Sequence, residues 1–254
     1  MTDLHELVSG FTDVDAYERG RPGYPPEAVA PILEALGVDP GARVVDLGAG
    51  TGKLSRGLLA AGLDVVALEP LPHMRAALER AVGPERVLAA TAEATTLPDA
   101  SADAVTAADS FHWFREAGAI AEMHRILRPG GGVALLWSIP AWRESGPGWH
   151  QEVGALIYGV RPLHPGFSGR RPEAAFAEAG GFEPVRASEI VTEQPTDREG
   201  LLAYVASISW IGAMAPDARA EVLAGVDAIL RRHGVEAIVQ PIRTELYVTR
   251  HRRG

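Results

Sequence analysis

The stretch Val44-Val45-Asp46-Leu47-Gly48-Ala49-Gly50-Thr51-Gly52 decides the fold that this sequence predicts. An apolar run that carries one acid changes there into alternating glycines, and a helical pattern with Leu54, Leu58 and Leu59 on one side follows. Because glycine has no Cβ, the backbone at such a strand-to-helix turn bends sharply and lets a ligand approach main-chain atoms. In open α/β sheets this turn lies at the carboxyl ends of the strands, where ligands bind. We therefore expect a nucleotide-like ligand here.

Strand and helix patterns alternate around this turn. Two prolines start a helix over residues 26–36, which Gly37 ends. Short apolar strands are expected at 43–47, 64–68, 86–90, 103–108 and 132–137. Helices are expected at 51–61, 71–81 and 115–127. Strict alternation of this kind implies right-handed crossovers and a parallel sheet, so the fold class is α/β.

The alternation stops after Trp137. We expect one helix that starts near Pro147, then a strand at 184–191, two helices within 199–233 and a last strand at 242–249. No internal repeat or low-complexity linker interrupts the chain. We interpret residues 1–254 as a single domain with an N-terminal lid at 1–26 and a helical cap at approximately 138–170 and 199–233.

Composition limits the classes of function. The 254 residues are 46% hydrophobic and carry a formal charge of −9, which argues against a nucleic-acid partner. The chain has no cysteine, which excludes disulfides and thiolate sites. The histidines show no metal-ligand spacing, so no metal is expected. No export signal or membrane-length apolar run is visible, and we expect a cytoplasmic protein without a membrane partner.

The glycine spacing separates three kinds of nucleotide loop. A Walker A loop requires a glycine where this chain has Leu47, and a Ser or Thr where it has Leu54. The dinucleotide fingerprint requires its third glycine at position 53, which is lysine. A nicotinamide oxidoreductase therefore remains an alternative only if the glycine spacing does not indicate the cofactor.

The pattern Asp46-x-Gly48-x-Gly50-x-Gly52 resembles motif I of the class I S-adenosylmethionine (SAM)-dependent methyltransferases. Further motifs of the family follow in order: Val65 to Glu69, Thr91-Ala92-Glu93 with Leu97-Pro98, Ala102 to Val105, and Leu127 to Gly132. Tyr17 with Arg21 to Pro25, and Ser110 to Phe114, resemble the small-molecule branch that includes trans-aconitate-methyltransferase-like enzymes. The resemblance implies a Rossmann-like fold whose seven-stranded, mostly parallel sheet has an antiparallel last strand, with an inserted helical cap.

The resemblance also implies the parts of a cofactor site. Glu69 is expected to accept hydrogen bonds from both ribose hydroxyls, because a carboxylate can accept two side by side. Asp46 is expected to orient the loop or to reach the ammonium group of the cofactor through water, and a purely structural role is the alternative. The remaining cofactor contacts are expected from Tyr17, Arg21, Gly48, Ala49, Gly50, Pro70, Met74, Thr91, Ala92, Asp109 and Ser110. For Asp109 or Ser110, a cap on the helix that starts near Arg115 is the alternative. Glu93 is expected to contact the adenine side or to face solvent.

The acceptor end of the site is less defined. His112 follows the fourth strand, where a histidine suits a general base, although a packed, hydrogen-bonded histidine is the alternative. Trp113, Trp137 and Tyr158 are expected to wall the pocket for the acceptor, and aromatic faces there would favour the positive sulfonium.

We thus expect methyl transfer from SAM to the O, N or C atom of a small organic acceptor, with S-adenosylhomocysteine as product. A methyltransferase that acts on RNA or protein and a SAM-binding protein that methylates nothing are the alternatives. The oligomeric state is expected to be monomer or homodimer.

Overall fold

The computed structural model describes residues 10–11, 13–140, 148–161 and 172–252. The chain divides into two compact units. We call residues 23–138, 165–190 and 244–254 the sheet unit, and residues 1–22, 139–164 and 191–243 the helical unit. The helical unit contains most of the segments that we expected as lid and cap.

Seven strands form one sheet in the order β3-β2-β1-β4-β5-β7-β6. The strands are β1 Arg43–Leu47, β2 Asp64–Leu68, β3 Val87–Leu88, β4 Ala102–Ala108, β5 Leu127–Pro140, β6 Arg186–Asp197 and β7 Ala237–Arg250. β1 pairs in parallel with β2 and β4, and the pairs β2–β3 and β4–β5 are also parallel. β7 runs antiparallel to β5, as the reciprocal bonds between His251 and residues 130–131 show. The expected fold class is confirmed.

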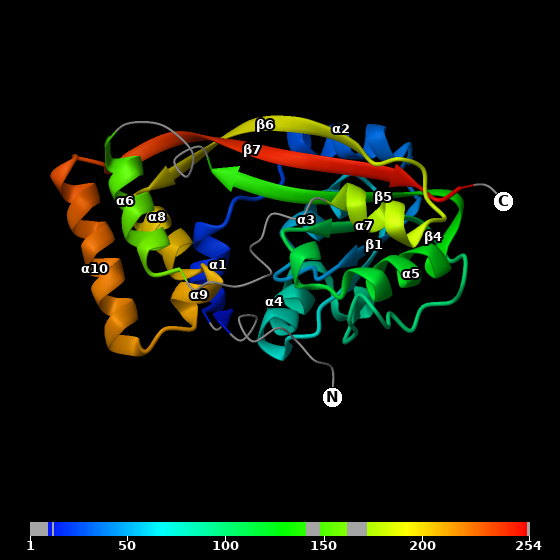
Figure 1. Ribbon diagram of the computed structural model, residues 1–254, viewed down its shortest axis with the longest axis horizontal. Coiled ribbons are helices and arrows are strands. Elements are labelled where there is room, and N and C mark those ends of the chain that lie inside the picture. The colour runs from blue at the N-terminus through cyan, green and yellow to red at the C-terminus, as the bar shows by residue number, and fades with distance from the viewer. Residues whose placement is uncertain (1–9, 12, 141–147, 162–171, 253–254) are drawn as a thin grey trace. The chain divides into compact units, whose positions relative to one another are not determined.

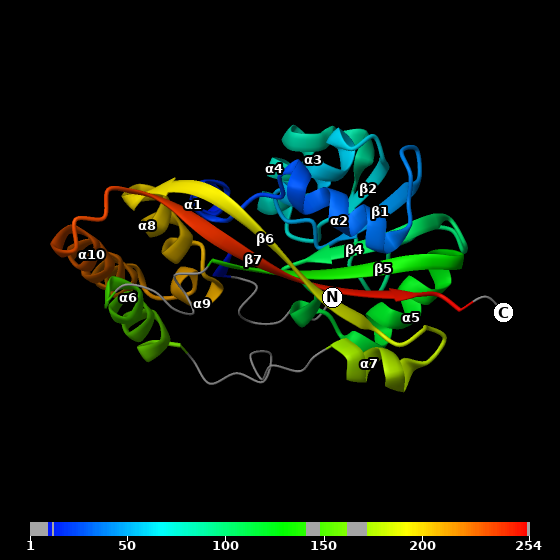
Figure 2. The same ribbon diagram turned by 90° about the horizontal axis from the view of Figure 1, so that it is seen from above.

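Helices cover both faces of the sheet in the sheet unit (Figures 1 and 2). On one face α2 Pro26–Leu36, α3 Lys53–Ala60 and α4 Pro72–Val82 pack against side chains such as Val44. On the other face α5 Glu116–Ile126 and α7 Pro172–Ala179 pack against side chains such as Val45. Successive strand residues point to opposite faces, so Val44 and Val45 enter different cores, and both are fully buried.

The helical unit contains α1 Val14–Gly20, α6 Gly148–Gly159, α8 Arg198–Ala206, α9 Ser209–Gly212 and α10 Pro216–Arg232. α1 packs on α8, and α10 packs on α6 and α8. The approach of α1 is close, because a Cβ at Gly20 would lie 2.1 Å from the backbone nitrogen of Tyr204. No helix in the described ranges is long and apolar enough to span a membrane.

Several boundaries differ from the sequence expectation. β5 begins at Leu127, where we expected a turn up to residue 131. Ala102 pairs with Leu127 and Ala104 pairs with Gly132, so a bulge with Gly130 at φ +84° absorbs the extra residues. α7 was not predicted, because its short Ala-rich sequence carries little periodicity. β6 and β7 both extend beyond the expected 184–191 and 242–249. Pro147, the expected helix start, lies outside the described residues, and α6 is described from Gly148.

Candidate functional site

The carboxyl ends of β1, β2 and β4 bring the predicted site residues to one edge of the sheet. Gly48, Glu69 and Asp109 each follow directly after the last residue of one of these parallel strands. The chain goes from β1 to β2 on one side of β1 and returns to β4 on the other. The glycine loop therefore lies at the point where the strand order reverses, which is where open α/β sheets bind ligands.

Asp46 lies on β1 at this edge and accepts hydrogen bonds from both α3 and β4. Its Oδ2 accepts a hydrogen bond of 2.6 Å from Ser55 Oγ on α3, and its Oδ1 accepts one of 2.9 Å from Thr106 Oγ1 on β4. The residue is 1% exposed, and burial raises the pKa of its carboxyl to about 6, while the two hydroxyls oppose that change. These contacts favour the structural side of our expectation for Asp46.

Gly48 brings the first loop against the segment after β4. Its φ is +62°, and a Cβ at this position would lie 2.8 Å from the Cβ of Ser110. Ser110 Oγ donates a 2.8 Å hydrogen bond to the carbonyl oxygen of Leu47. Only glycine satisfies both the positive φ and the close approach, so the ends of β1 and β4 are held together at this residue.

Glu69 bridges the glycine loop and the end of β2. Its Oε2 accepts from the backbone N–H of Gly50 and its Oε1 from that of Leu71, both at 2.9 Å. Arg75 fixes the same turn by donating to the carbonyl oxygens of Glu69 and Pro70. Glu69 is 5% exposed, and burial raises the pKa of its carboxyl to about 7 despite these hydrogen bonds. A carboxylate offers further lone pairs beyond the two in use, so hydroxyl donors can still bind to it.

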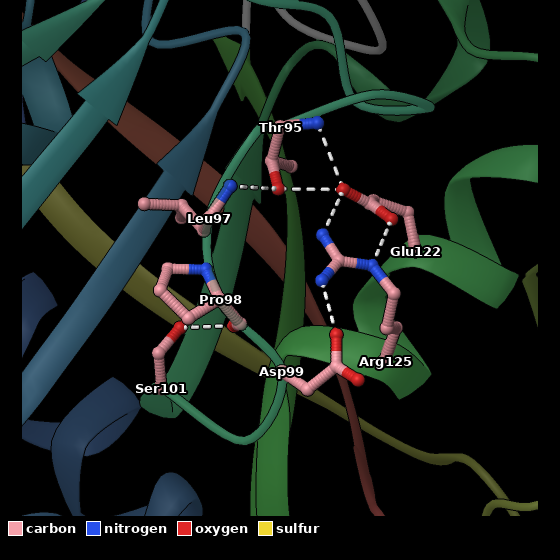
Figure 3. Close-up of polar contacts among 7 residues, drawn as sticks. All are labelled: Thr95, Leu97, Pro98, Asp99, Ser101, Glu122 and Arg125. Atoms are coloured by element: carbon pink, nitrogen blue, oxygen red, sulfur yellow. Dashed lines mark hydrogen bonds and ion pairs between the residues drawn. The ribbon is translucent and has the colours of Figure 1, made fainter.

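The loop after β3 is fastened along α5. Glu122 Oε1 accepts from the backbone nitrogen of Thr95 at 2.8 Å and from Thr95 Oγ1 at 2.6 Å (Figure 3). Arg125 donates to both oxygens of Glu122 and also to Asp99 Oδ1, at 2.5 Å. The hydrogen bonds from Arg125, followed by those from Thr95 and then by the charge of Arg125, lower the pKa of Glu122 to about 2, against the opposing effect of burial. Sequence reasoning missed this network, because Thr95 and Glu122 are 27 positions apart and only the Glu-Arg spacing on the helix was visible.

Glu93 connects the same loop to the start of α5. Its Oε1 accepts a 2.8 Å hydrogen bond from the backbone nitrogen of Arg115, the residue before the helix. Neither Asp109 nor Ser110 caps this helix, which corrects our alternative for them, because a short 3-10 turn at Phe111–Trp113 separates them from α5. The loop that we expected on the adenine side is thus hydrogen-bonded to the segment that leads from His112 into α5.

Asp109 has strained backbone at the end of β4. It is a non-glycine residue with a φ of +51°, and its Oδ1 accepts from the backbone nitrogen of Ser138 at 3.1 Å. Its own N–H donates to the carbonyl oxygen of Leu136. Strained residues of this kind persist where the surrounding structure holds them, and they gather at functional sites.

His112 has a hydrogen-bond partner that sequence reasoning did not foresee. Trp137 Nε1 donates to His112 Nδ1 at 3.2 Å, and the ring of Trp113 lies 4.8 Å from the imidazole. An indole N–H can only donate, so Nδ1 holds a lone pair and a neutral His112 carries its proton on Nε2. Trp137 also packs edge-on against Tyr247 and Phe111, which keeps the donor in place.

The other predicted cofactor residues occupy different environments. Met74 on α4 and Ala92 are each 4% exposed, whereas Ala49, Pro70 and Thr91 are partly exposed. Tyr17, Arg21 and Tyr158 belong to the helical unit. There Arg21 donates to Ser207 Oγ at 2.8 Å and stacks on the ring of Tyr204 at 4.8 Å. Tyr158 is 39% exposed and lies beside Trp210. Their roles toward the cofactor or the acceptor stay predictions.

The helical unit also has an open groove of about 590 Å³. It is lined by Arg19, residues 195–197, Gly200 and residues 237–239. None of the residues predicted from the sequence lines it, and Arg19 is already paired with Asp197 and Glu199. We therefore place the candidate site at the glycine loop.

Comparison with known proteins shows which family part of the chain is similar to. Residues 45–135 match the family model described as a methyltransferase domain. A methyltransferase of uncharacterized function from Mycobacterium tuberculosis is 48% identical over 144 residues, which are 57% of this chain and 56% of that protein. This match spans little more than half the length of that relative.

Longer matches are more distant in sequence. A methyltransferase of uncharacterized function from Schizosaccharomyces pombe is 28% identical over 224 residues, with 87% of this chain and 86% of that protein covered. A solved structure described as a type II methyltransferase from Anaeromyxobacter dehalogenans superposes with a TM-score of 0.64 at 25% identity, and covers 92% of this chain and 97% of that one.

The Glu122 network predicts a pH-dependent contribution to stability. Because the folded pKa lies near 2 and the ordinary value is 4.5, the contribution is complete above about pH 4.5 and is lost as the pH falls toward 2. Glu122→Gln should lower the free energy of unfolding at pH 7 by about 1.5–3 kcal/mol, the usual range for charge-assisted hydrogen bonds. Urea unfolding at pH 7 and pH 3 measures both effects. The exposed Glu34→Gln serves as control, and an equal loss in the two variants would contradict the prediction.

Proposed function

Because residues 45–135 match the model of a methyltransferase domain, we propose that the protein transfers the methyl group of SAM to a small organic acceptor. The observation that carries the proposal is the position of Glu69. Its buried carboxylate meets the backbone N–H of Gly50 where the strand order reverses, so an acceptor for sugar hydroxyls lies directly beside the glycine loop.

In this proposal the cofactor lies across the ends of β1, β2 and β4. Gly48, which is partly exposed, leaves main-chain atoms accessible to the amino-acid end of SAM, and Glu69 accepts from the ribose hydroxyls. Thr91 and Ala92 contact the edge of the adenine. They lie on a loop that hydrogen bonds to Glu93 and Glu122 hold against α5. Asp109 and Ser110 close the site beneath the methyl group.

The reaction is an in-line displacement. A lone pair of the acceptor forms a bond to the methyl carbon as the carbon–sulfur bond breaks. The electron pair of the broken bond stays on the sulfur of S-adenosylhomocysteine. The sulfonium is a good leaving group, so catalysis comes mostly from holding the acceptor at attack distance in a dry pocket. An acceptor proton, where one exists, must leave to a base or to water.

The hydrogen bond from Trp137 supports a revised role for His112. With its proton on Nε2, a neutral His112 offers a donor there and cannot remove a proton through that atom. We therefore propose that His112 orients the acceptor by donating to one of its oxygen atoms. An acceptor that reacts as a carboxylate or another ionised group fits this arrangement, because it needs no general base.

Product analysis tests the function itself. The protein is incubated with SAM and, in separate arms, with a small-molecule extract, RNA or a protein fraction, and mass spectrometry records the gain of one methyl group. We expect methylated product in the small-molecule arm alone. Gly48→Ala should abolish it, whereas Gly41→Ala, which also has a positive φ but no atom within 4 Å of a Cβ, should retain it. Product only in the RNA or protein arm would overturn the proposal.

Glu69 predicts how cofactor affinity depends on pH. The ionised carboxylate accepts ribose hydroxyls better than the protonated form, and its pKa is near 7. SAM should bind about tenfold more tightly at pH 8 than at pH 6, as the ionised fraction rises. The same raised pKa lowers the stability of the cofactor-free fold as the pH rises from about 4.5 to 7. Calorimetric titration measures the affinity, and Glu69→Gln should bind weakly at both pH values. Unchanged binding in this variant would remove Glu69 from the site.

His112→Gln distinguishes a donor from a base. The glutamine amide can donate a hydrogen bond near the position of Nε2, but it cannot accept a proton at neutral pH. His112→Gln should therefore retain much more turnover than His112→Ala, with SAM affinity unchanged in both variants. Release of S-adenosylhomocysteine in the presence of the identified acceptor gives kcat. Equal, large losses of kcat in the two variants would restore the general-base role.

A further inference from the structure

Two histidines meet at the edge of the sheet opposite the glycine loop. His124 lies in the last turn of α5, and His251 follows the end of β7 beside the start of β5. Their Nε2 atoms are 3.0 Å apart, and their ring centroids are 4.2 Å apart with planes at 74°. Two rings that met head-on through these nitrogens would have centroids further apart. The contact is a hydrogen bond between the two rings, and a cation that replaces its proton would meet both Nε2 atoms.

The hydrogen bond on the other side of His251 determines where its proton lies. Its Nδ1 is 3.2 Å from the carbonyl oxygen of Arg128. A carbonyl oxygen can only accept, so Nδ1 carries the proton and Nε2 keeps its lone pair in the neutral ring. Metal-binding histidines usually make this same bond from their second nitrogen to a backbone carbonyl, because it orients the ring and raises its basicity.

The residues around His124 leave room for both rings. The backbone of Gly181 has φ +76°, and a Cβ there would lie 2.5 Å from Cδ2 and 2.7 Å from Nε2 of His124. Phe182 packs edge-on against His124 with 5.7 Å between ring centroids. Partial desolvation, followed by the charge of His251, lowers the pKa of His124. His124 is exposed, which gives an ion access from solvent.

We propose that His124 and His251 together bind one late first-row divalent cation, with Cu²⁺ preferred. With metal–nitrogen bonds of about 2.05 Å, a separation of 3.0 Å between Nε2 atoms corresponds to an angle of about 94° at the metal. That angle fits the tetragonal geometry of Cu²⁺ or Ni²⁺ better than the tetrahedral geometry of Zn²⁺. Among such ions Cu²⁺ binds nitrogen ligands most strongly.

The described residues contain no group of three or more potential ligands, so water would complete the coordination. The bound ion would connect the end of α5 to the end of β7. An ion that binds the folded chain alone stabilises it in proportion to its concentration above Kd.

Titration with Cu²⁺ tests the proposal. Calorimetry should detect one site, and electron paramagnetic resonance should show two equivalent nitrogen ligands. His124→Ala and His251→Ala should each weaken binding by about tenfold or more. The double variant should lose less than the sum of the two single losses, because the chelate is broken once. His73→Ala, at an exposed position on α4, should bind as the wild type does. Unchanged affinity in both single variants, or losses that add, would overturn the proposal.

Neighbouring glycines provide a matched second test. Gly181→Ala places a Cβ against the ring of His124 and should displace it, so Cu²⁺ binding should fall at least as much as in His124→Ala. Gly180→Ala carries similar strain, with φ +72°, but its Cβ meets no atom within 4 Å, so binding should persist. Melting temperatures without metal identify any variant that fails to fold. A Gly181→Ala protein that is folded and binds Cu²⁺ normally would contradict the site.

Discussion

Asp46 places an acid inside the sheet unit with 1% of its surface exposed, and two hydroxyl groups, from Ser55 and Thr106, hold it there. A buried carboxylate without partners is strongly unfavourable, so this position is stable only when α3 and β4 both supply their donors. The glycine loop leaves β1 two residues later. Its course from β1 into α3, and its approach to β4 at Gly48, therefore depend on these two contacts.

The second support of the site is α5. Glu93 binds the backbone at its start, Glu122 holds Thr95 near its end, and the last carbonyls accept from Ala100 and Ser101. The loop after β3 thus follows the helix over its length. Thr96 and Ala100 in this loop have positive φ values, which the surrounding hydrogen bonds maintain. The segment with His112 leads directly into the same helix. The proposed adenine side and the proposed acceptor side of the site are therefore both positioned by α5.

Local patterns were sufficient for much of this description. The glycine spacing and the acid at the end of the second strand predicted where the loop and Glu69 lie, because both depend on neighbours in the chain. Residues whose role depends on a distant partner were not predictable in the same way. The proton position on His112 follows from Trp137, and the low pKa of Glu122 follows from Arg125 and Thr95 together. The bulge at the start of β5 depends on its pairing with Ala102 and Ala104, which periodicity does not contain.

Periodicity and glycine placement, which act over a few residues, were enough to predict the α/β class, the position of the glycine turn and the succession of strands along the chain up to Trp137. Tertiary structure alone decided which acids are buried, which histidine nitrogen carries a proton and which histidines become neighbours. Those properties arise from solvent exclusion and from atoms that approach within hydrogen-bond distance only after folding. His124 and His251 are 127 positions apart in the chain, and only the pairing of β7 beside β5 brings them together.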